Sequence, residues 1–308
     1  MRKVYGVTYQ QPPFSEGPHI DARDTAIIFE GGGMRNSYTA ACVAKLVEEG
    51  VECRWVGGVS AGASHVTNYL SQDADRAEHS FVEFVNNPSF GGIGSLLRGN
   101  GYFNAEFIYE RSADNELPFD WDTFSSHPTE MHLEAMRADT GETVRWTRQN
   151  IPNLKELVVR VRASSTLPLI MPMPIIDGAP YVDGALGETG GIVIDAAEKT
   201  GAEKFLFIAT KPRDYIRPEV PRPQAVRRFF RKTPAVAEAL IRRPARYNAA
   251  KQRLLELERE GRALLFFPDD MRVSSTERNA AKLRANFEAG RTQTANEWPA
   301  WKEFLGAD

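Results

Sequence analysis

The fold is decided by the stretch Gly57-Gly58-Val59-Ser60-Ala61-Gly62-Ala63, which has the spacing Gly-x-Ser-x-Gly around Ser60. This spacing is typical of a nucleophile elbow, a sharp turn between a strand and a helix that exposes the serine hydroxyl at the edge of a sheet. Trp55-Val56 precede it as an apolar strand end, and residues 61–70 follow with apolar residues at helical spacing. We therefore predict that Ser60 lies on such an elbow and acts as a nucleophile.

A glycine-rich turn lies upstream of this stretch. The buried strand expected at residues 25–29 runs into Glu30-Gly31-Gly32-Gly33-Met34-Arg35, and a helix that ends near Gly50 follows. Strand, turn, helix and second strand form a βαβ unit, so the two strands are expected to be parallel neighbours. The glycine turn and Ser60 then meet at the carboxyl edge of the sheet, where open α/β sheets bind ligands.

The glycines of this turn expose backbone N–H groups that can hold an anion at a helix N-terminus. A nucleotide phosphate is the weaker candidate, because the sequence lacks a P-loop lysine and Asn36 breaks the dinucleotide pattern. A flexible turn without a ligand is the simplest alternative. We favour the oxyanion of an acyl intermediate, because a serine nucleophile is expected nearby, and each donor of such a hole lowers the barrier by about 2.7–4 kcal/mol.

The base that activates Ser60 is not expected to be a histidine. The chain has five, and none follows residue 132, whereas the order of α/β-hydrolases requires one downstream of the acid. His65 follows on the same helix as Ser60 and is expected to point away from the hydroxyl. The five histidines are His19, His65, His79, His127 and His132.

An aspartate is therefore expected to be the base. Asp177-Gly178 lies between two apolar pairs, a pattern typical of a tight hairpin turn, so we interpret Asp177 as structural. Asp183 ends the returning strand, and the small residues Gly184-Ala185 let it approach the elbow. A carboxylate within hydrogen-bond reach of Ser60 can take its proton directly.

Together, Gly31-Gly32-Gly33-x-Arg35, Gly58-x-Ser60-x-Gly62 and Asp183-Gly184-Ala185 resemble the motifs of the patatin-like phospholipases, from about residue 25 to about residue 210. Ala163-Ser164-Ser165-x-x-Pro168 resembles the small-residue segment that lines the site in that family. The resemblance implies a serine lipid acyl hydrolase with a Ser-Asp dyad. It also implies that Ser60 is the nucleophile, Asp183 the base, and the amides of Gly31, Gly32 and Gly33 the oxyanion hole. Arg35 is implied to hold the loop and to face an anionic substrate.

Three positions depart from the pattern of this family. Asn36 stands where the family usually has glycine, and Ala185 replaces the second glycine after the aspartate. Residues 187–191 replace a segment that often contains proline. These differences leave the dyad intact and bear on the choice of substrate.

The composition is that of an ordinary globular protein, with 42% hydrophobic residues, 26% charged residues and a formal net charge of −3 among 308 residues. No apolar run approaches the length of a membrane span. Cys42 and Cys53 are expected to be buried reduced thiols of a cytoplasmic protein. No metal-ligand spacing is present, and we expect no cofactor.

Two further segments can be interpreted from the arrangement of their apolar residues. Residues 72–128 are expected to form helices and loops whose large side chains pack in the core, an interpretation that we favour over an acyl-pocket wall. Met131–Trp146 is expected to form a hairpin that extends the sheet. The large side chains of the first segment are Phe81, Phe84, Val85, Leu96, Leu97, Phe103, Phe107 and Ile108.

Residues 222–246 contain eight basic residues and one acid, interleaved with apolar side chains. Such a stretch is typical of peripheral contact with an anionic membrane, although a solvated helix face is the simpler alternative. No nucleic-acid-binding motif accompanies it, so we expect no nucleic-acid partner. Residues 247–305 are expected to continue as helices that are interrupted at Pro268 and Pro299 and have no catalytic role.

These observations predict a three-layer α/β/α protein with a mainly parallel sheet and a helical C-terminal extension. We expect a catalytic domain at residues 20–215 and a helical region at residues 216–308 that packs on it. The expected reaction is hydrolysis of a lipid ester, phospholipid or acylglycerol, through an acyl-enzyme. The alternatives are an acyltransferase that uses the same dyad, a non-catalytic lipid-binding protein, and a nucleotide-binding module built on the glycine turn.

Overall fold

A mixed, mostly parallel sheet forms the centre of the protein. The computed structural model describes residues 2–4, 7–9, 19–92, 94–95, 98–111 and 117–307. Within these residues, eight strands form one sheet in the order β10-β9-β3-β4-β5-β8-β7, with β6 paired to β5. The strands of this sheet are β3 (Ile20–Phe29), β4 (Val51–Gly58), β5 (Glu130–Arg137), β6 (Thr143–Trp146), β7 (Ile175–Ile176), β8 (Ala179–Asp183), β9 (Lys204–Ile208) and β10 (Ala263–Phe266). Two short strands, β1 (Arg2–Val4) and β2 (Val7–Tyr9), pair with each other.

The strands from β10 to β5 run parallel, and β6, β8 and β7 are antiparallel to their partners. The predicted βαβ unit is confirmed, because β3 and β4 are parallel neighbours that end in register at Phe29 and Gly58. The predicted hairpin at Met131–Trp146 is confirmed as β5 and β6. The carboxyl ends of β3, β4 and β9 therefore lie at one edge of the sheet, where the loops that follow them meet.

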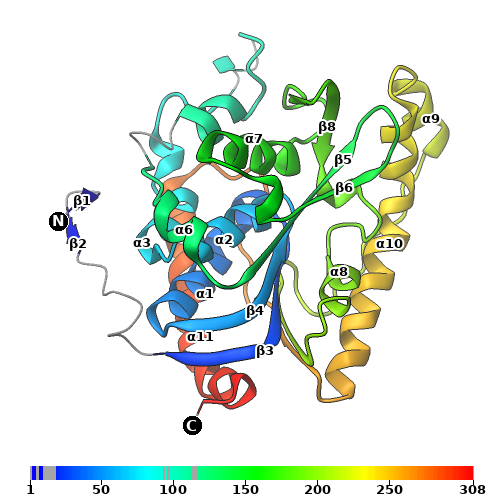
Figure 1. Ribbon diagram of the computed structural model, residues 1–308. Coiled ribbons are helices and arrows are strands. Elements are labelled where there is room, and N and C mark those ends of the chain that lie inside the picture. The colour runs from blue at the N-terminus through cyan, green and yellow to red at the C-terminus, as the bar shows by residue number, and fades with distance from the viewer. Residues whose placement is uncertain are drawn as a thin grey trace.

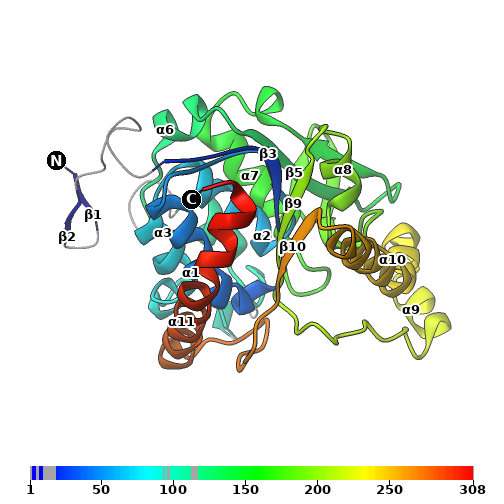
Figure 2. The ribbon, with the colours of Figure 1, turned by 90° about the horizontal axis from the view of Figure 1, so that it is seen from below.

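Helices cover both faces of the sheet and give three layers (Figures 1 and 2). Side chains alternate along β3, so that Ile27 and Phe29 face one buried cluster whereas Ala26 and Ile28 face the other. The first face is covered by α1 (Asn36–Glu48), α2 (Ala61–Leu70), α3 (Ala74–Phe81), α6 (Trp121–Ser126), α7 (Leu154–Ser165) and α11 (Ala280–Leu305). The second face is covered by α8 (Ile194–Glu198) and α10 (Pro234–Arg259), with α9 (Pro223–Phe229) packed at the start of α10.

The expectation of continuous helices over residues 247–305 is wrong at Ala263–Phe266, which form the edge strand β10 beside β9. A short apolar run of this length has no period that separates a strand from a buried helix. Pro299 does not interrupt a helix but lies inside α11, on its exposed side, where water can bond the carbonyl that loses its partner. The boundary at residue 215 stays a prediction.

The segment at residues 72–128 contains α3, α6 and a π-helical turn at Glu106–Arg111. This agrees with the expectation of helices and loops. Leu96 and Leu97 lie outside the described residues. In the part of the chain that the structure describes, no helix is both long enough and apolar enough to span a membrane.

Candidate active site

Ser60 lies on the sharp turn between β4 and α2, with φ 56° and ψ −133°. A side chain in this conformation costs about 1–3 kcal/mol of strain, which the surrounding packing must offset. A Cβ on Gly58 would lie 2.7 Å from the Gly62 carbonyl oxygen, and one on Gly62 would lie 2.3 Å from the Phe29 oxygen. Both glycines are therefore required, and the predicted elbow geometry is confirmed.

The C-terminal end of α7 fixes the positions of both dyad candidates. The Ser60 amide donates to the carbonyl oxygen of Ser164 at 3.1 Å and to its Oγ at 3.0 Å. The Asp183 amide donates to the Thr166 oxygen at 2.8 Å. The small residues of this segment let the two backbones approach, and Ser165 lines the cavity beside them.

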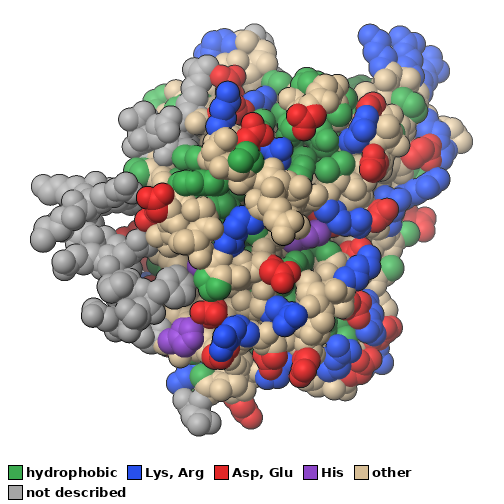
Figure 3. Space-filling view, viewed as in Figure 1, with side chains coloured by type: hydrophobic (Ala, Val, Ile, Leu, Met, Phe, Trp, Pro, Cys, Tyr) green, Lys and Arg blue, Asp and Glu red, His purple; other side chains and the backbone are tan. Residues whose placement is uncertain are grey.

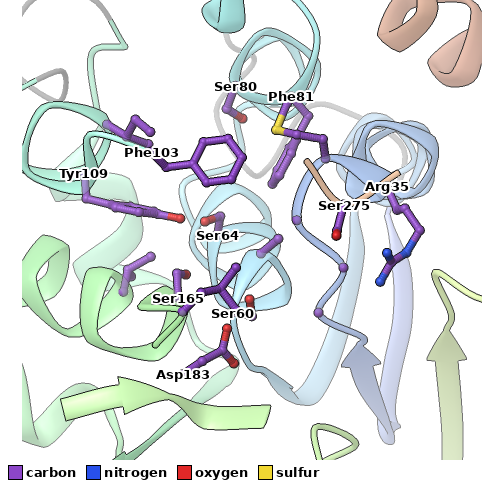
Figure 4. Close-up of a pocket in the computed structure, with 18 of the residues that line it drawn as sticks. Arg35, Ser60, Ser64, Ser80, Phe81, Phe103, Tyr109, Ser165, Asp183 and Ser275 are labelled. Carbon is purple, nitrogen blue, oxygen red and sulfur yellow. The ribbon is translucent and has the colours of Figure 1, made fainter. Parts of the chain in front are cut away.

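Asp183 ends β8 and is buried, with 2% of its surface exposed. Its carboxylate lies beside the Ser60 hydroxyl, and the two side chains point toward one another in Figure 4. Burial raises the pKa of Asp183, whereas Arg243, the Ala185 amide and Ser60 act to lower it. The Ala185 amide donates to Asp183 Oδ1 at 2.8 Å, so the carboxylate is held in place.

Asp177 lies elsewhere, in the turn between β7 and β8, with φ 51° followed by φ 77° at Gly178. These angles are those of the tight hairpin turn predicted from the Asp-Gly pair. The structure thus brings Asp183, and not Asp177, next to Ser60.

The glycine turn packs directly against the elbow. A Cβ on Gly31 would lie 2.8 Å from the Ser60 Cβ, and one on Gly33, at φ 57°, would lie 2.4 Å from the Ser275 oxygen. The amides of Gly31, Gly32 and Gly33 donate no hydrogen bond to another of the described residues. The turn therefore presents free donors beside Ser60.

Side chains behind the turn hold it rigidly. Thr210 donates from Oγ1 to the Gly31 oxygen at 3.1 Å, and Asn36 donates from Nδ2 to the Glu30 oxygen at 3.0 Å. The buried Glu30 carboxylate accepts from the Tyr247 hydroxyl at 2.7 Å and from the Thr210 amide at 2.6 Å. Asn36, which replaces the usual glycine, thus anchors the turn.

The histidines lie away from this arrangement. His65 is fully buried, 2.9 Å from Thr39 Oγ1, and burial lowers its pKa to about 3. All five histidines belong to the described part of the chain, and none lines the cavity next to Ser60. The described residues include no group of three or more His, Cys, Asp or Glu placed to hold a metal ion.

A cavity of about 300 Å³ opens next to Ser60, Asp183 and the glycine turn. Phe81, Phe103 and Ile108 line it, and they also belong to or pack against buried apolar clusters, so these large side chains of residues 72–128 serve both the core and the cavity wall. A run of apolar residues looks the same in sequence whether it faces a cavity or a packed interior. The other apolar lining residues include Phe90, Leu117, Phe119, Leu157, Val158, Val161, Leu167 and Met171.

Five cations line the same cavity: Arg35, Arg76, Lys211, Arg217 and Arg243. Arg35 was expected here, and burial lowers its pKa while Glu30 acts to raise it. The sequence analysis missed the other four. Lys211 and Arg217 follow β9 at the carboxyl edge of the sheet. This position could have predicted that they line the site. Arg243 was assigned only to the basic stretch.

The patatin-like phospholipase family model matches residues 27–194, and a model described as a domain of unknown function (DUF6363) matches residues 233–306. Among solved structures, the chain is similar to VipD from Legionella pneumophila, at 11% sequence identity and a TM-score of 0.47. That match covers 89% of this chain and 66% of the VipD chain, just under two thirds of its length. No curated protein matches the sequence. Because the first model covers more than half of the sequence, this chain belongs to the patatin-like phospholipase family.

Proposed function

We propose that the protein is a serine lipid acyl hydrolase that cleaves carboxylic esters of phospholipids or acylglycerols through an acyl-enzyme on Ser60. The observation that carries the proposal is the pairing of the Ser60 hydroxyl with the buried Asp183 carboxylate beside an apolar cavity. Membership of the patatin-like phospholipase family supports the same class of reaction.

In the first half of the proposed reaction, Asp183 takes the hydroxyl proton while Ser60 Oγ attacks the ester carbonyl carbon. The carbonyl electron pair moves onto oxygen, and the amides of the glycine turn stabilise the resulting oxyanion. When the carbonyl re-forms, the ester C–O bond breaks and the alcohol leaves with the proton held by Asp183. Water then repeats these steps on the acyl-enzyme, releasing the fatty acid and restoring the Ser60 hydroxyl.

The environment of Asp183 suits it to this role. A general base works best when its pKa approaches the working pH, and burial raises that of Asp183. The apolar lining of the cavity suits an acyl chain, because its burial there removes hydrocarbon from water.

The test is hydrolysis of p-nitrophenyl butyrate by the native protein and by Ser60→Ala, Asp183→Asn and Asp177→Asn. We expect the first two variants to lose activity by on the order of 10³-fold or more, because both residues take part in the same step. Asp177→Asn is the matched control, since it removes a carboxylate from a turn whose backbone angles asparagine also tolerates. Circular dichroism checks the fold of each variant. Full activity in folded Asp183→Asn would assign the base elsewhere.

A fluorophosphonate probe separates the enzyme from a lipid-binding protein with the same fold. We expect it to label Ser60 in the native chain and to leave Ser60→Ala unlabelled. An inactive and unlabelled native chain would overturn the proposal. Product analysis with an added alcohol distinguishes hydrolysis from acyl transfer, because a transferase yields the new ester instead of the free acid.

A further inference from the structure

The Tyr109 hydroxyl is a polar group of the cavity to which the reaction proposed above gives no role. Tyr109 lies on the π-helical turn at Glu106–Arg111 and lines the cavity together with Ser60 and Asp183. In Figure 4 its hydroxyl points toward Ser64, on the side of Ser60 opposite Arg35. Single π-helical turns are rare and are frequent at functional sites, so this turn calls for a closer account.

Packing and an ion pair hold the π-helical turn in place. Tyr109 packs against two buried apolar clusters, the one on the α1 face of the sheet and the one that contains Phe103. Arg162 of α7 pairs with Glu110, the residue after Tyr109. The turn is therefore attached to the same helix whose C-terminal end positions Ser60 and Asp183.

Two serine hydroxyls face the phenol oxygen of Tyr109. Ser64 lies on α2, one turn after Ser60, and Ser165 is the last residue of α7. Both hydroxyls act to lower the pKa of Tyr109, as groups that donate to its oxygen do. Ser165 Oγ is buried and has no other hydrogen-bond partner among the described residues. Because the serines serve the phenol oxygen, the phenol proton is left for a further acceptor.

The phenol of Tyr109 is neutral under ordinary conditions. Burial raises its pKa, and the charge of Asp183 raises it further, whereas Ser165 and Ser64 act in the opposite direction. A phenol whose pKa lies above the ordinary value of about 10 keeps its proton at neutral pH and is a hydrogen-bond donor. The effect of Asp183 also shows that the hydroxyl lies within range of the charge of the proposed base.

The proposed reaction creates an acceptor on this side of Ser60. The oxyanion of the tetrahedral intermediate faces the amides of the glycine turn, which Arg35 follows. The leaving oxygen takes its proton from Asp183, so it must lie near that carboxyl group. The Tyr109 hydroxyl lies across Ser60 from Arg35 and within range of Asp183, which is where the leaving oxygen is expected.

We propose that Tyr109 is a further catalytic residue, whose hydroxyl donates a hydrogen bond to the leaving oxygen of the ester. The inference rests on the proposed hydrolase function. When the ester C–O bond breaks, its electron pair moves to the leaving oxygen, which receives the proton held by Asp183. Tyr109 keeps its own proton throughout. Its hydrogen bond strengthens as negative charge builds up on the leaving oxygen, so it stabilises the transition state more than the bound ester.

The test measures kcat/KM of the native chain and of Tyr109→Phe on butyrate esters that share the acyl group. The leaving oxygen becomes more basic in the order p-nitrophenyl, phenyl, trifluoroethyl and ethyl butyrate. We expect Tyr109→Phe to lower kcat/KM on ethyl butyrate by about 10- to 100-fold, the usual effect of losing a hydrogen bond to a charged group. Activity on p-nitrophenyl butyrate is expected to stay almost native, because p-nitrophenolate leaves without such help.

Tyr102→Phe is the matched control, since it removes a phenol hydroxyl from the same segment but from a residue that does not line the cavity. It is expected to keep the native dependence on the leaving group. Circular dichroism and Tm check that both variants are folded. An equal loss on all four esters would mean that Tyr109 only supports the fold of the site, and no loss on any ester would also overturn the proposal.

A second measurement strengthens the donor instead of removing it. Incorporation of 3-fluorotyrosine at position 109 makes the phenol more acidic and keeps the shape of the side chain. We expect the ratio of kcat/KM on ethyl butyrate to that on p-nitrophenyl butyrate to rise above the native value. A fall in this ratio, as in the phenylalanine variant, would overturn the role as a donor. A native chain that cleaves none of these esters would overturn the proposed function, and the role of Tyr109 with it.

Discussion

Gly31 is the residue at which the glycine turn and the elbow come closest, and it provides the first prediction at the residue scale. A Cβ at this position would lie 2.7 Å from the Val59 oxygen and 2.8 Å from the Ser60 Cβ. We expect Gly31→Ala to displace the turn and to reduce kcat on p-nitrophenyl butyrate by about 10²–10³-fold, the usual effect of losing one oxyanion donor.

The matched control is Gly94→Ala, because a Cβ there meets only Arg98 Nη1 at 3.4 Å. This variant is expected to keep native activity and Tm. A fully active Gly31→Ala protein would show that the turn does not hold the oxyanion.

Asp183 provides the second prediction, because a buried charge costs free energy of unfolding. Burial raises its pKa above the ordinary 3.8. Below the ordinary pKa the carboxyl is protonated in both the folded and the unfolded chain, so it imposes no penalty. Above the raised pKa it is ionised in both states, and the penalty is complete. We therefore expect Asp183→Asn to raise Tm at pH 8, and to raise it less at pH 4, in thermal unfolding scans.

Asp177→Asn again serves as the control, since Asp177 lies in an exposed turn. An Asp183→Asn protein whose gain in Tm is the same at both pH values would contradict the assignment of the penalty to the carboxylate charge.

Single residues also show where sequence analysis succeeded. Ser60 is bracketed by glycines whose spacing is a local steric requirement, so the elbow could be predicted from its heptapeptide alone. The roles of Asp177 and Asp183 could be distinguished from the sequence, because an Asp-Gly pair between two apolar pairs is typical of a tight hairpin turn. Arg243 could not be placed in the cavity, because its position depends on how α10 packs against the loop after β8.

At the scale of elements, the cations of the basic stretch at residues 222–246 fall into two groups. Some bond to other parts of the protein, and the others are exposed to solvent. Arg243 and Arg246 donate to carbonyl oxygens of the loop after β8, and Arg227 pairs with Glu238. Of the other exposed cations, Arg228, Arg231 and Lys232 lie at the end of α9 or just after it. Lys and Arg side chains gather there at the upper right of Figure 3.

The end of α9 provides the third prediction, since Phe229 is 65% exposed among these cations. A solvent-exposed aromatic ring within a basic patch is suited to an anionic lipid surface. We expect the native chain to bind vesicles of phosphatidylglycerol more tightly than vesicles of phosphatidylcholine in sedimentation assays. Replacing Arg228, Arg231 and Lys232 by Gln is expected to weaken this binding by about 1 kcal/mol per charge.

A control with the same change in net charge replaces Lys199, Arg259 and Arg291, which are exposed on other elements. If both triple variants lose binding equally, the attraction is a matter of overall charge and α9 has no special part in it.

At the scale of the whole molecule, the C-terminal part was the least predictable. β10 is a short apolar run, and its partner β9 lies far away in sequence, so only the assembled sheet identifies it as a strand. α11 begins and ends at residues of the kinds that commonly start and stop helices, yet the proline inside it led us to predict an interruption. Local pattern thus predicted the βαβ unit and both hairpins, which are specified by neighbouring residues, and failed where long-range pairing decides the structure.

The arrangement of the C-terminal elements leads to the last prediction, which tests whether residues 20–215 fold as a separate domain. α11 packs tightly on α1, because a Cβ on Gly290 would lie 2.2 Å from the Tyr38 oxygen, and the Tyr38 hydroxyl donates to Gln293 Oε1 at 2.5 Å. α10 covers the opposite face of the sheet. A chain that ends at residue 215 would therefore expose the parts of the two faces that α10 and α11 cover, and the edge of β9.

We expect the chain of residues 1–215 to aggregate or to lack a cooperative thermal transition, even though it retains Ser60 and Asp183. Co-expression with residues 216–308 is the matched control, and it is expected to restore a soluble complex that the fluorophosphonate probe labels. A monomeric 1–215 chain that unfolds cooperatively and is labelled at Ser60 would instead establish an independent catalytic domain. In that case α10 and α11 would be additions to a fold that is stable without them.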